Sequence, residues 1–176
     1  YYELGARFTK WRGVYNIGKK YPSKIAINSN AHALARYSAL VQECGMVPIV
    51  EPEVLMDGDH SADDCLIKTS EVIQKCFEEL LIHKIDLTGI ILKPNMILAG
   101  NKSKNKISNE EVSSKTLECL KKSVPNEVPG IAFLSGGQSE IEATENLNLI
   151  NKNNNTNFIM TYSYGRALQQ SALKFW

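Results

Sequence analysis

Two charged pairs and one lysine stand where short apolar segments of this sequence end. Lys10 and Arg12 are two residues apart, as are Glu51 and Glu53, so each pair would lie on one face of an extended strand. Lys93 directly follows an apolar run. Partial burial and a neighbouring cation both favour a neutral amine, which can attack a carbonyl carbon and form a Schiff base. A carboxylate beside that amine can transfer protons, so these residue types indicate Schiff-base chemistry.

Each of these charged residues also has a plainer interpretation. Lys10 could be an exposed surface charge, and Arg12 could be a salt-bridge partner. Lys93 could be a solvated residue at the rim of a sheet. We expect at least one of Glu51 and Glu53 to be a structural carboxylate that pairs with a neighbouring lysine or arginine.

Two glycine-containing turns could bind an anion. Ser135-Gly136-Gly137 precedes a predicted helix that starts near Ser139, and Gly165-Arg166 follows the last apolar run. Backbone N–H groups beside glycines can approach a phosphate closely, and a helix N-terminus adds favourable dipole charge. Because the loops after the last two strands of a (β/α)8 barrel commonly bind phosphate, the two turns together indicate a phosphate site.

The histidines and cysteines show no metal-binding pattern. His32, His60 and His83 are far apart and lack His-x-x-His and Glu-x-x-His spacing. We therefore predict no tightly bound zinc ion, and we expect each histidine to be a surface or capping residue. The four cysteines form no Cys-x-x-Cys pair. Three of them are expected to be small buried hydrophobic residues in a reducing cytosol: Cys65, Cys76 and Cys119.

Strand-like apolar runs alternate with amphipathic helix-like segments along the chain. The predicted strands are residues 7–14, 46–50, 87–92, 131–134 and 158–163. The predicted helices are residues 30–44, 61–83, 108–122, a segment through Ile141 and Leu147, and 166–175. Asn30 is a candidate cap for the first helix, Ser61 with Asp64 resembles a capping box, and Ser108 with Glu111 opens the third helix.

This order predicts an α/β fold with parallel strands covered by helices. A doubly wound sheet and a (β/α)8 barrel both fit, and the pattern contains only five βα units. The 176 residues suit one domain. Because 20 basic and 19 acidic residues leave a net charge of +1, there is no electrostatic case for binding nucleic acid or an acidic membrane surface. No apolar run is long enough for a transmembrane helix.

Five segments of the chain, taken together and in order, resemble class I fructose-bisphosphate aldolases. The resemblance spans nearly the whole chain. The matching segments are Phe8-Thr9-Lys10-Trp11-Arg12, Val47-Pro48-Ile49-Val50-Glu51-Pro52-Glu53, Leu92-Lys93-Pro94-Asn95-Met96, Phe133-Leu134-Ser135-Gly136-Gly137-Gln138-Ser139 and Ser163-Tyr164-Gly165-Arg166-Ala167-Leu168-Gln169.

The resemblance implies a (β/α)8 (TIM) barrel that cleaves fructose 1,6-bisphosphate to dihydroxyacetone phosphate and glyceraldehyde 3-phosphate. It implies that Lys93 is the Schiff-base lysine, that Lys10 is the active-site lysine beside it, and that Glu51 is the proton shuttle. Glu53 is similar to a second carboxylate that supports the catalytic lysine. The resemblance assigns phosphate binding to Arg12 for the distal phosphate and, for the C1 phosphate of the ketose, to Ser135, Gly136, Gly165 and Arg166. It implies no metal and no cofactor.

The same resemblance implies that residues 1–176 are the C-terminal part of one barrel domain. The first predicted strand matches the family's fourth, the chain starts at Tyr1 rather than Met, and the family's C-terminal tail has no counterpart after Trp176. We therefore expect strands four to eight of the barrel. We also expect this segment alone to be poorly stable and inactive, because part of a barrel exposes two parallel strand edges.

Three functional hypotheses stay open at this point. The first is the aldolase, a cytoplasmic lyase of glycolysis that acts on a sugar phosphate and forms a homotetramer when full length. The second is a non-catalytic barrel fragment or scaffold that binds a protein partner such as actin. The third is another Schiff-base lyase, such as a transaldolase-like enzyme, although the residues suited to a phosphate at each end of the substrate disfavour it.

Overall fold

The protein contains one sheet of five parallel strands, which lie side by side in the order of the chain. The computed structural model describes all 176 residues. The strands are β1 (Phe8–Tyr15), β2 (Val47–Val54), β3 (Ile91–Leu92), β4 (Gly130–Phe133) and β5 (Ile159–Tyr162). The helices are α1 (Lys24–Glu43), α2 (Ala62–Ile82), α3 (Asn109–Ser123), α4 (Glu140–Lys152) and α5 (Arg166–Phe175), with short 3-10 turns at Tyr2–Leu4 and Leu87–Gly89.

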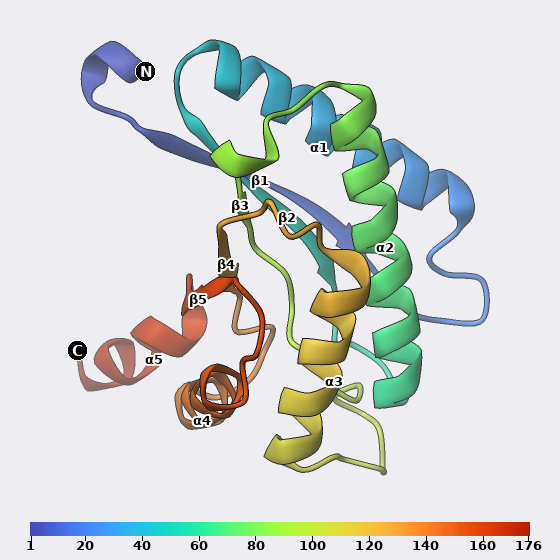
Figure 1. Cartoon of the computed structure of the whole chain (residues 1–176). Coiled ribbons are helices and arrows are strands. Elements are labelled where there is room, and N and C mark those ends of the chain that lie inside the picture. The colour runs from blue at the N-terminus through green and yellow to red at the C-terminus, as the bar shows by residue number, and fades with distance from the viewer.

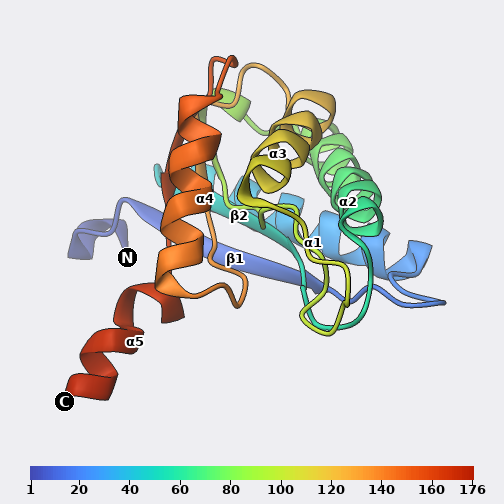
Figure 2. The same cartoon turned by 90° about the horizontal axis from the view of Figure 1, so that it is seen from below.

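The helices α1 to α4 follow one another around one face of the sheet (Figure 1). Figure 2 shows the same layering from below, with α1 beside β1 and β2, α3 between α2 and α4, and α5 apart from α1, α2 and α3. A cluster of 25 buried residues fills the space between the sheet and the helices, among them Leu34, Phe77, Leu92 and Phe133. The α/β fold with a parallel sheet is therefore as the sequence predicted.

Strand β2 is longer than predicted and runs through Glu51-Pro52-Glu53. Proline lacks the N–H that a central strand needs, which is why the sequence suggested an earlier end. A proline is tolerated here because the neighbouring strand β3 is short: it contains only Ile91 and Leu92 and pairs with Ile49 and Val50. Pro52 therefore lies beyond the β3 pairing and is partnered only on the β1 side, by Gly13.

The predicted strand 87–92 is wrong in its first part. Residues Leu87–Gly89 form a 3-10 turn because the Asp86 side chain accepts a hydrogen bond from the Thr88 backbone N–H at 2.9 Å. This Asx turn competes with extended backbone, as short polar side chains commonly do. Only Ile91 and Leu92 then reach the sheet.

The first helix also begins earlier than predicted, at Lys24 rather than Asn30. Its N-cap is Ser23, whose side chain accepts a hydrogen bond from the Ala26 N–H at 3.3 Å, so Asn30 lies inside the helix. The other helix starts are confirmed: Ser61 with Asp64 and Ser108 with Glu111 both form reciprocal capping boxes.

Strands β1 and β5 are the two edges of the sheet, and each has a neighbour on one side only. Both carry large exposed apolar side chains. Phe8 and Trp11 on β1 are 63% and 55% exposed, and Ile159 on β5 is 74% exposed. None of the helices combines the length and the apolar character that crossing a membrane requires.

Candidate active site

The candidate catalytic residues lie on the face of the sheet that faces away from the helices. On β1, a Cβ added to Gly13 would lie 3.4 Å from the α1 side chains of Asn30 and Leu34, so the helix-facing residues are Trp11, Gly13 and Tyr15. Lys10 and Arg12 therefore point to the opposite face, because side chains alternate along a strand. The parallel register places Lys10 beside Ile49 and Arg12 beside Glu51 on β2.

Glu51 is buried between two lysines. Its Oε1 lies 3.2 Å from Lys93 Nζ, and its Oε2 lies 3.0 Å from Lys10 Nζ. Glu51 Oε2 accepts no hydrogen bond, so the contact with Lys10 is an ion pair rather than an aligned hydrogen bond. Glu51 and Lys93 are 3% and 9% exposed, whereas the Lys10 side chain is 43% exposed. One carboxylate in this position can exchange protons with a buried amine and stay close to a second cation.

Arg12 and Glu53 form a second pair on the same face. Arg12 Nε donates to Glu53 Oε2, and this hydrogen bond raises the pKa of Arg12 above its usual value although partial burial opposes the change. Glu53 is 5% exposed, and the Arg12 side chain is 45% exposed. The plainer interpretation of Arg12 as a salt-bridge partner is confirmed. At least one of Glu51 and Glu53 was expected to pair with a neighbouring lysine or arginine, and Glu53 does so with Arg12.

Asn95 is a positioning residue that the sequence analysis did not single out. It follows Lys93 by two residues and is 5% exposed. Its Oδ1 accepts a hydrogen bond from the Val54 N–H at 2.9 Å, and its Nδ2 donates to Thr69 Oγ1 at 3.2 Å. Asn95 thus fastens the chain after Lys93 to the end of β2 and to α2. In the sequence, the only indication of this role is that Asn95 is a polar residue between Pro94 and an apolar run.

One cavity is lined by residues of both turns predicted to bind phosphate, although the predicted ligands Ser135 and Gly165 are not among them. The cavity has a volume of about 180 Å³ and is lined by eight residues, two of them hydrophobic, from the end of β2, the loops that follow β2, β3 and β4, and the start of α5. Among the lining residues are Glu53, Met56, Gly136, Gly137 and Arg166. The structure therefore brings together Gly136 and Arg166, which are 30 positions apart in the sequence.

Backbone geometry explains the glycines of the first turn. Gly136 and Gly137 have φ values of 57° and 82°, a left-handed conformation that strongly favours glycine. A Cβ on Gly137 would also lie 2.9 Å from Met56 Sδ, so the flexible Met56 side chain would have to shift; the positive φ values are what restrict the turn to glycine. The preceding Ser135 is 6% exposed.

A helix begins directly after each of these turns. Ser139 caps α4 with a capping box, which confirms the predicted helix start near this residue. Gly165 is the N-cap residue of α5. Arg166 is the first residue of α5 and is exposed. Both helix N-termini thus follow the glycine turns, which is the arrangement that favours anion binding.

The histidines depart from the expected pattern. His83 is the C-cap residue of α2, so the capping expectation is confirmed there. His60 is only 7% exposed and neither of its ring nitrogens has a hydrogen-bond partner, so the expectation of a surface or capping role is wrong for this residue. His32 and His83 are not far apart in space: their ring centroids are 5.0 Å from each other. The cysteines are as expected, because Cys65, Cys76 and Cys119 are buried and free.

A parallel sheet whose strands lie in chain order, with helices along one face only, is the arrangement found in (β/α)8 barrels, and this chain contains five of the βα units. The family model of class I fructose-bisphosphate aldolase, described as glycolytic, matches residues 1–176. The chain therefore belongs to the class I fructose-bisphosphate aldolase family.

Individual relatives agree with this assignment. The chain is 50% identical to "Fructose-bisphosphate aldolase 4, cytosolic" of Arabidopsis thaliana, with 100% of this chain and 45% of the relative covered. It is 49% identical to a probable class 1 aldolase of Xanthomonas campestris, of which it covers 53%. The structure of the aldolase from Plasmodium falciparum, in complex with TRAP and a small molecule inhibitor, superposes with a TM-score of 0.97 at 45% identity, covering 99% of this chain and 51% of that one. The chain thus spans about half the length of these relatives.

Proposed function

We propose that the whole protein containing this chain is a fructose 1,6-bisphosphate aldolase that acts through a Schiff base on Lys93. The observation that carries the proposal is the buried Glu51 carboxylate, which contacts both Lys93 Nζ and Lys10 Nζ. The membership of the aldolase family supports the same chemistry. In this proposal, residues 1–176 form the C-terminal part of one barrel domain.

The reaction begins when the neutral Lys93 amine attacks the C2 carbonyl carbon of the ketose and forms a carbinolamine. Glu51 in its protonated form donates a proton to the C2 hydroxyl group, which leaves as water, and an iminium ion results. The iminium then accepts the electron pair of the C3–C4 bond as that bond breaks, while the C4 hydroxyl proton passes to the Glu51 carboxylate. Glyceraldehyde 3-phosphate leaves. Protonation of the enamine at C3 and addition of one water molecule release dihydroxyacetone phosphate and restore the Lys93 amine.

Lys10 and Glu53 have supporting roles in this proposal. Lys10 keeps a positive charge within 3.0 Å of the proton-transferring carboxylate and so stabilises its ionised form between proton transfers. The resemblance assigns Glu53 to support of the catalytic lysine, but its ion pair is with Arg12. We therefore propose that this charge-assisted hydrogen bond orients the guanidinium for the distal phosphate.

The C1 phosphate of the ketose would bind at the two glycine turns. The proposed ligands are Ser135, Gly136, Gly165 and Arg166. The shared cavity of Gly136 and Arg166 supports this assignment, as do the helices that begin after each turn. Phosphate at each end of the substrate distinguishes this function from that of a transaldolase-like enzyme.

Borohydride trapping tests the proposal. The whole protein is incubated with dihydroxyacetone phosphate and borohydride, and the labelled peptide is mapped. Label is expected on Lys93 and is expected to disappear in Lys93→Ala. Lys10→Met is the matched control, because it removes the neighbouring lysine and should retain the label while turnover falls. Label that survives Lys93→Ala rejects the assignment.

The assembly and location of the protein are also proposals. Relatives named as cytosolic and cytoplasmic isozymes support a cytoplasmic location, and the family resemblance supports a homotetramer. Light scattering of the whole protein tests the tetramer. Co-sedimentation with filaments tests an actin partner, for which the resemblance is the only support.

A further inference from the structure

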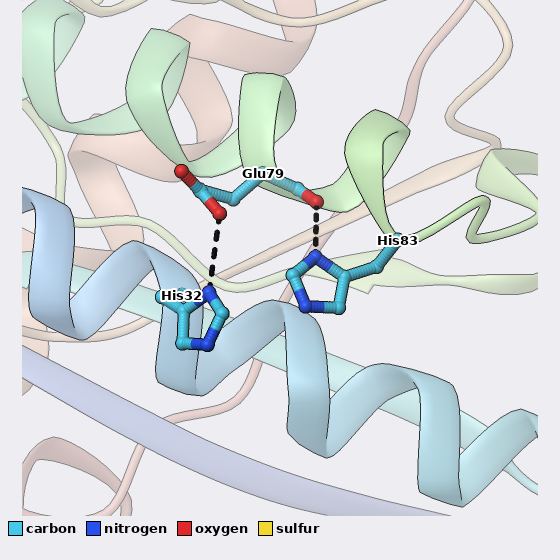
Figure 3. A group of neighbouring side chains, drawn as sticks. All are labelled: His32, Glu79 and His83. Atoms are coloured by element: carbon cyan, nitrogen blue, oxygen red, sulfur yellow. Dashed lines mark hydrogen bonds and ion pairs between the residues drawn. The ribbon is translucent and has the colours of Figure 1, made fainter.

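The geometry points to a transition-metal site on the outside of the molecule, and we propose that His32, Glu79 and His83 together bind one Zn²⁺ ion. The three residues come from two helices: His32 lies on α1, Glu79 lies on α2, and His83 caps the end of α2. One ligand atom from each residue lies within 4.8 Å of the other two. Figure 3 shows the two imidazole rings side by side below the Glu79 side chain, and their planes meet at 67°.

His83 is oriented by a hydrogen bond that leaves one nitrogen available. Its Nδ1 lies 2.9 Å from the backbone carbonyl oxygen of Glu79. Because a carbonyl oxygen can only accept, Nδ1 must carry the proton, and in the neutral ring Nε2 then holds the free lone pair. A backbone carbonyl that fixes the tautomer in this way is the usual outer-shell partner of a metal-binding histidine.

Glu79 is also held in place before any metal binds. Its Oε1 lies 3.2 Å from Lys75 Nζ, and its Oε2 lies 3.4 Å from His32 Nδ1. One oxygen of the carboxylate therefore already faces an imidazole of the cluster, and the other is held by a lysine.

The distances require only a small adjustment. Zinc bonds of about 2.0–2.2 Å in a tetrahedral site place the ligand atoms about 3.4 Å apart. The three atoms would have to approach one another by up to about 1.5 Å from their present separations. The His32 side chain is 53% exposed, so rotation of this side chain can supply the movement. Its exposure also leaves room for water as the fourth ligand.

The ligand set selects the type of cation. Two imidazole nitrogens and one carboxylate suit Zn²⁺ and similar transition metals, whereas Mg²⁺ and Ca²⁺ prefer sites made of oxygen atoms. The site is separate from the candidate active site, because α1 and α2 cover one face of the sheet and Lys93 and Glu51 lie on the other. It does not depend on the proposed aldolase activity.

A competition titration with a chromophoric zinc chelator tests the site in the whole protein at about pH 7.5, where imidazoles are neutral. Glu79→Gln and Glu78→Gln form a matched pair, because Glu78 Oε2 and Glu79 Oε1 are both 3.2 Å from Lys75 Nζ. Each variant removes one partner of Lys75, and only Glu79→Gln removes a proposed zinc ligand. His32→Gln changes an exposed side chain and therefore tests a second ligand with little effect on folding.

We expect one Zn²⁺ ion per chain at this site, with no competition from Mg²⁺. Loss of an outer-shell partner weakens metal binding by about 10–100-fold, so Glu79→Gln and His32→Gln should each weaken it by at least about tenfold. Glu78→Gln should bind within about twofold of the wild type, because it leaves all three ligands in place. Equal affinity in Glu78→Gln and Glu79→Gln would overturn the proposal, as would the absence of zinc binding in the wild type.

Discussion

Replacement of Glu51 by glutamine removes the single negative charge between Lys93 and Lys10. The side chain keeps its shape, but neither amine then has a carboxylate within 3.2 Å at this position. Loss of one partner from a buried ion pair costs about 3–5 kcal/mol. Because the Lys10 side chain is 43% exposed, water screens that contact, and the glutamine oxygen still faces Lys93. We therefore expect the free energy of unfolding to fall by about 3 kcal/mol, the lower end of this range.

The effect on turnover should be larger than the effect on stability. A positioned acid–base group accelerates a reaction by about 10²–10⁴-fold, and glutamine can neither donate nor accept the proton of the C2 or C4 hydroxyl. We expect kcat of Glu51→Gln to fall within that range in a coupled cleavage assay of the whole protein. Denaturant unfolding, followed by circular dichroism, measures the stability change on the same samples.

Glu71→Gln is the control for the chemical change itself. Glu71 pairs with Lys68 at 2.9 Å on the surface of α2, and its side chain is 41% exposed. Exposed pairs contribute about 0–1 kcal/mol, so this variant should retain both stability and turnover. A Glu51→Gln variant that turns over within threefold of the wild type, or that loses no more stability than Glu71→Gln, would refute the reasoning about a buried proton-transferring carboxylate.

Four further outcomes are expected. Arg166→Ala should raise KM for fructose 1,6-bisphosphate by about ten- to hundredfold, the loss of one charge-assisted hydrogen bond, and an unchanged KM would remove Arg166 from the phosphate site. Gly137→Ala should lower the unfolding free energy by about 0.5–1.5 kcal/mol more than Gly5→Ala, because both have positive φ but only at Gly137 must the Met56 side chain leave its rotamer; equal losses would contradict the contact with Met56. Burial lowers the pKa of His60, so the folded state resists protonation and should lose stability as pH falls below about 6.5; unfolding measured in His60→Gln should show a weaker dependence, and an identical slope would count against it. The isolated 176-residue chain should be inactive and show no cooperative melt by circular dichroism, because β1 and β5 are unpaired edges; a cooperative melt with normal turnover would contradict this.

The positions of the main candidate residues could be predicted because they depend on short-range rules. Side chains alternate along a strand, and parallel strands end at the same edge of their sheet. Alternation is enough to place Lys10 and Glu51 on one face, and Lys93 follows the end of β3 as expected. Lys10 and Glu51, however, lie inside β1 and β2 rather than at the ends of these strands. The spacing did not indicate that Glu51 rather than Glu53 would contact both lysines, since that depends on the register of β1 against β2.

Element boundaries were harder to predict where the deciding interaction lies outside the segment. Ser23 starts α1 earlier than Asn30 through one side-chain hydrogen bond. Pro52 stays within β2 because β3 pairs only with Ile49 and Val50. No hydrogen bond to β3 is therefore lost at Pro52, which has no N–H. In both cases the local pattern was consistent with the observed element, but a choice between two possible ends required knowledge of a neighbouring residue or strand.

The cluster of His32, Glu79 and His83 shows where such reasoning stops being possible. Glu79 and His83 are four residues apart, which places them on one face of α2 and is visible in the sequence. His32 is 47 residues from Glu79, and its contact depends on the rotation and crossing of α1 against α2. Helices that cover the outside of a sheet have several acceptable rotations, whereas a half-buried strand has only two faces. Sites on strands are therefore open to prediction from spacing, and sites between surface helices require the packed structure.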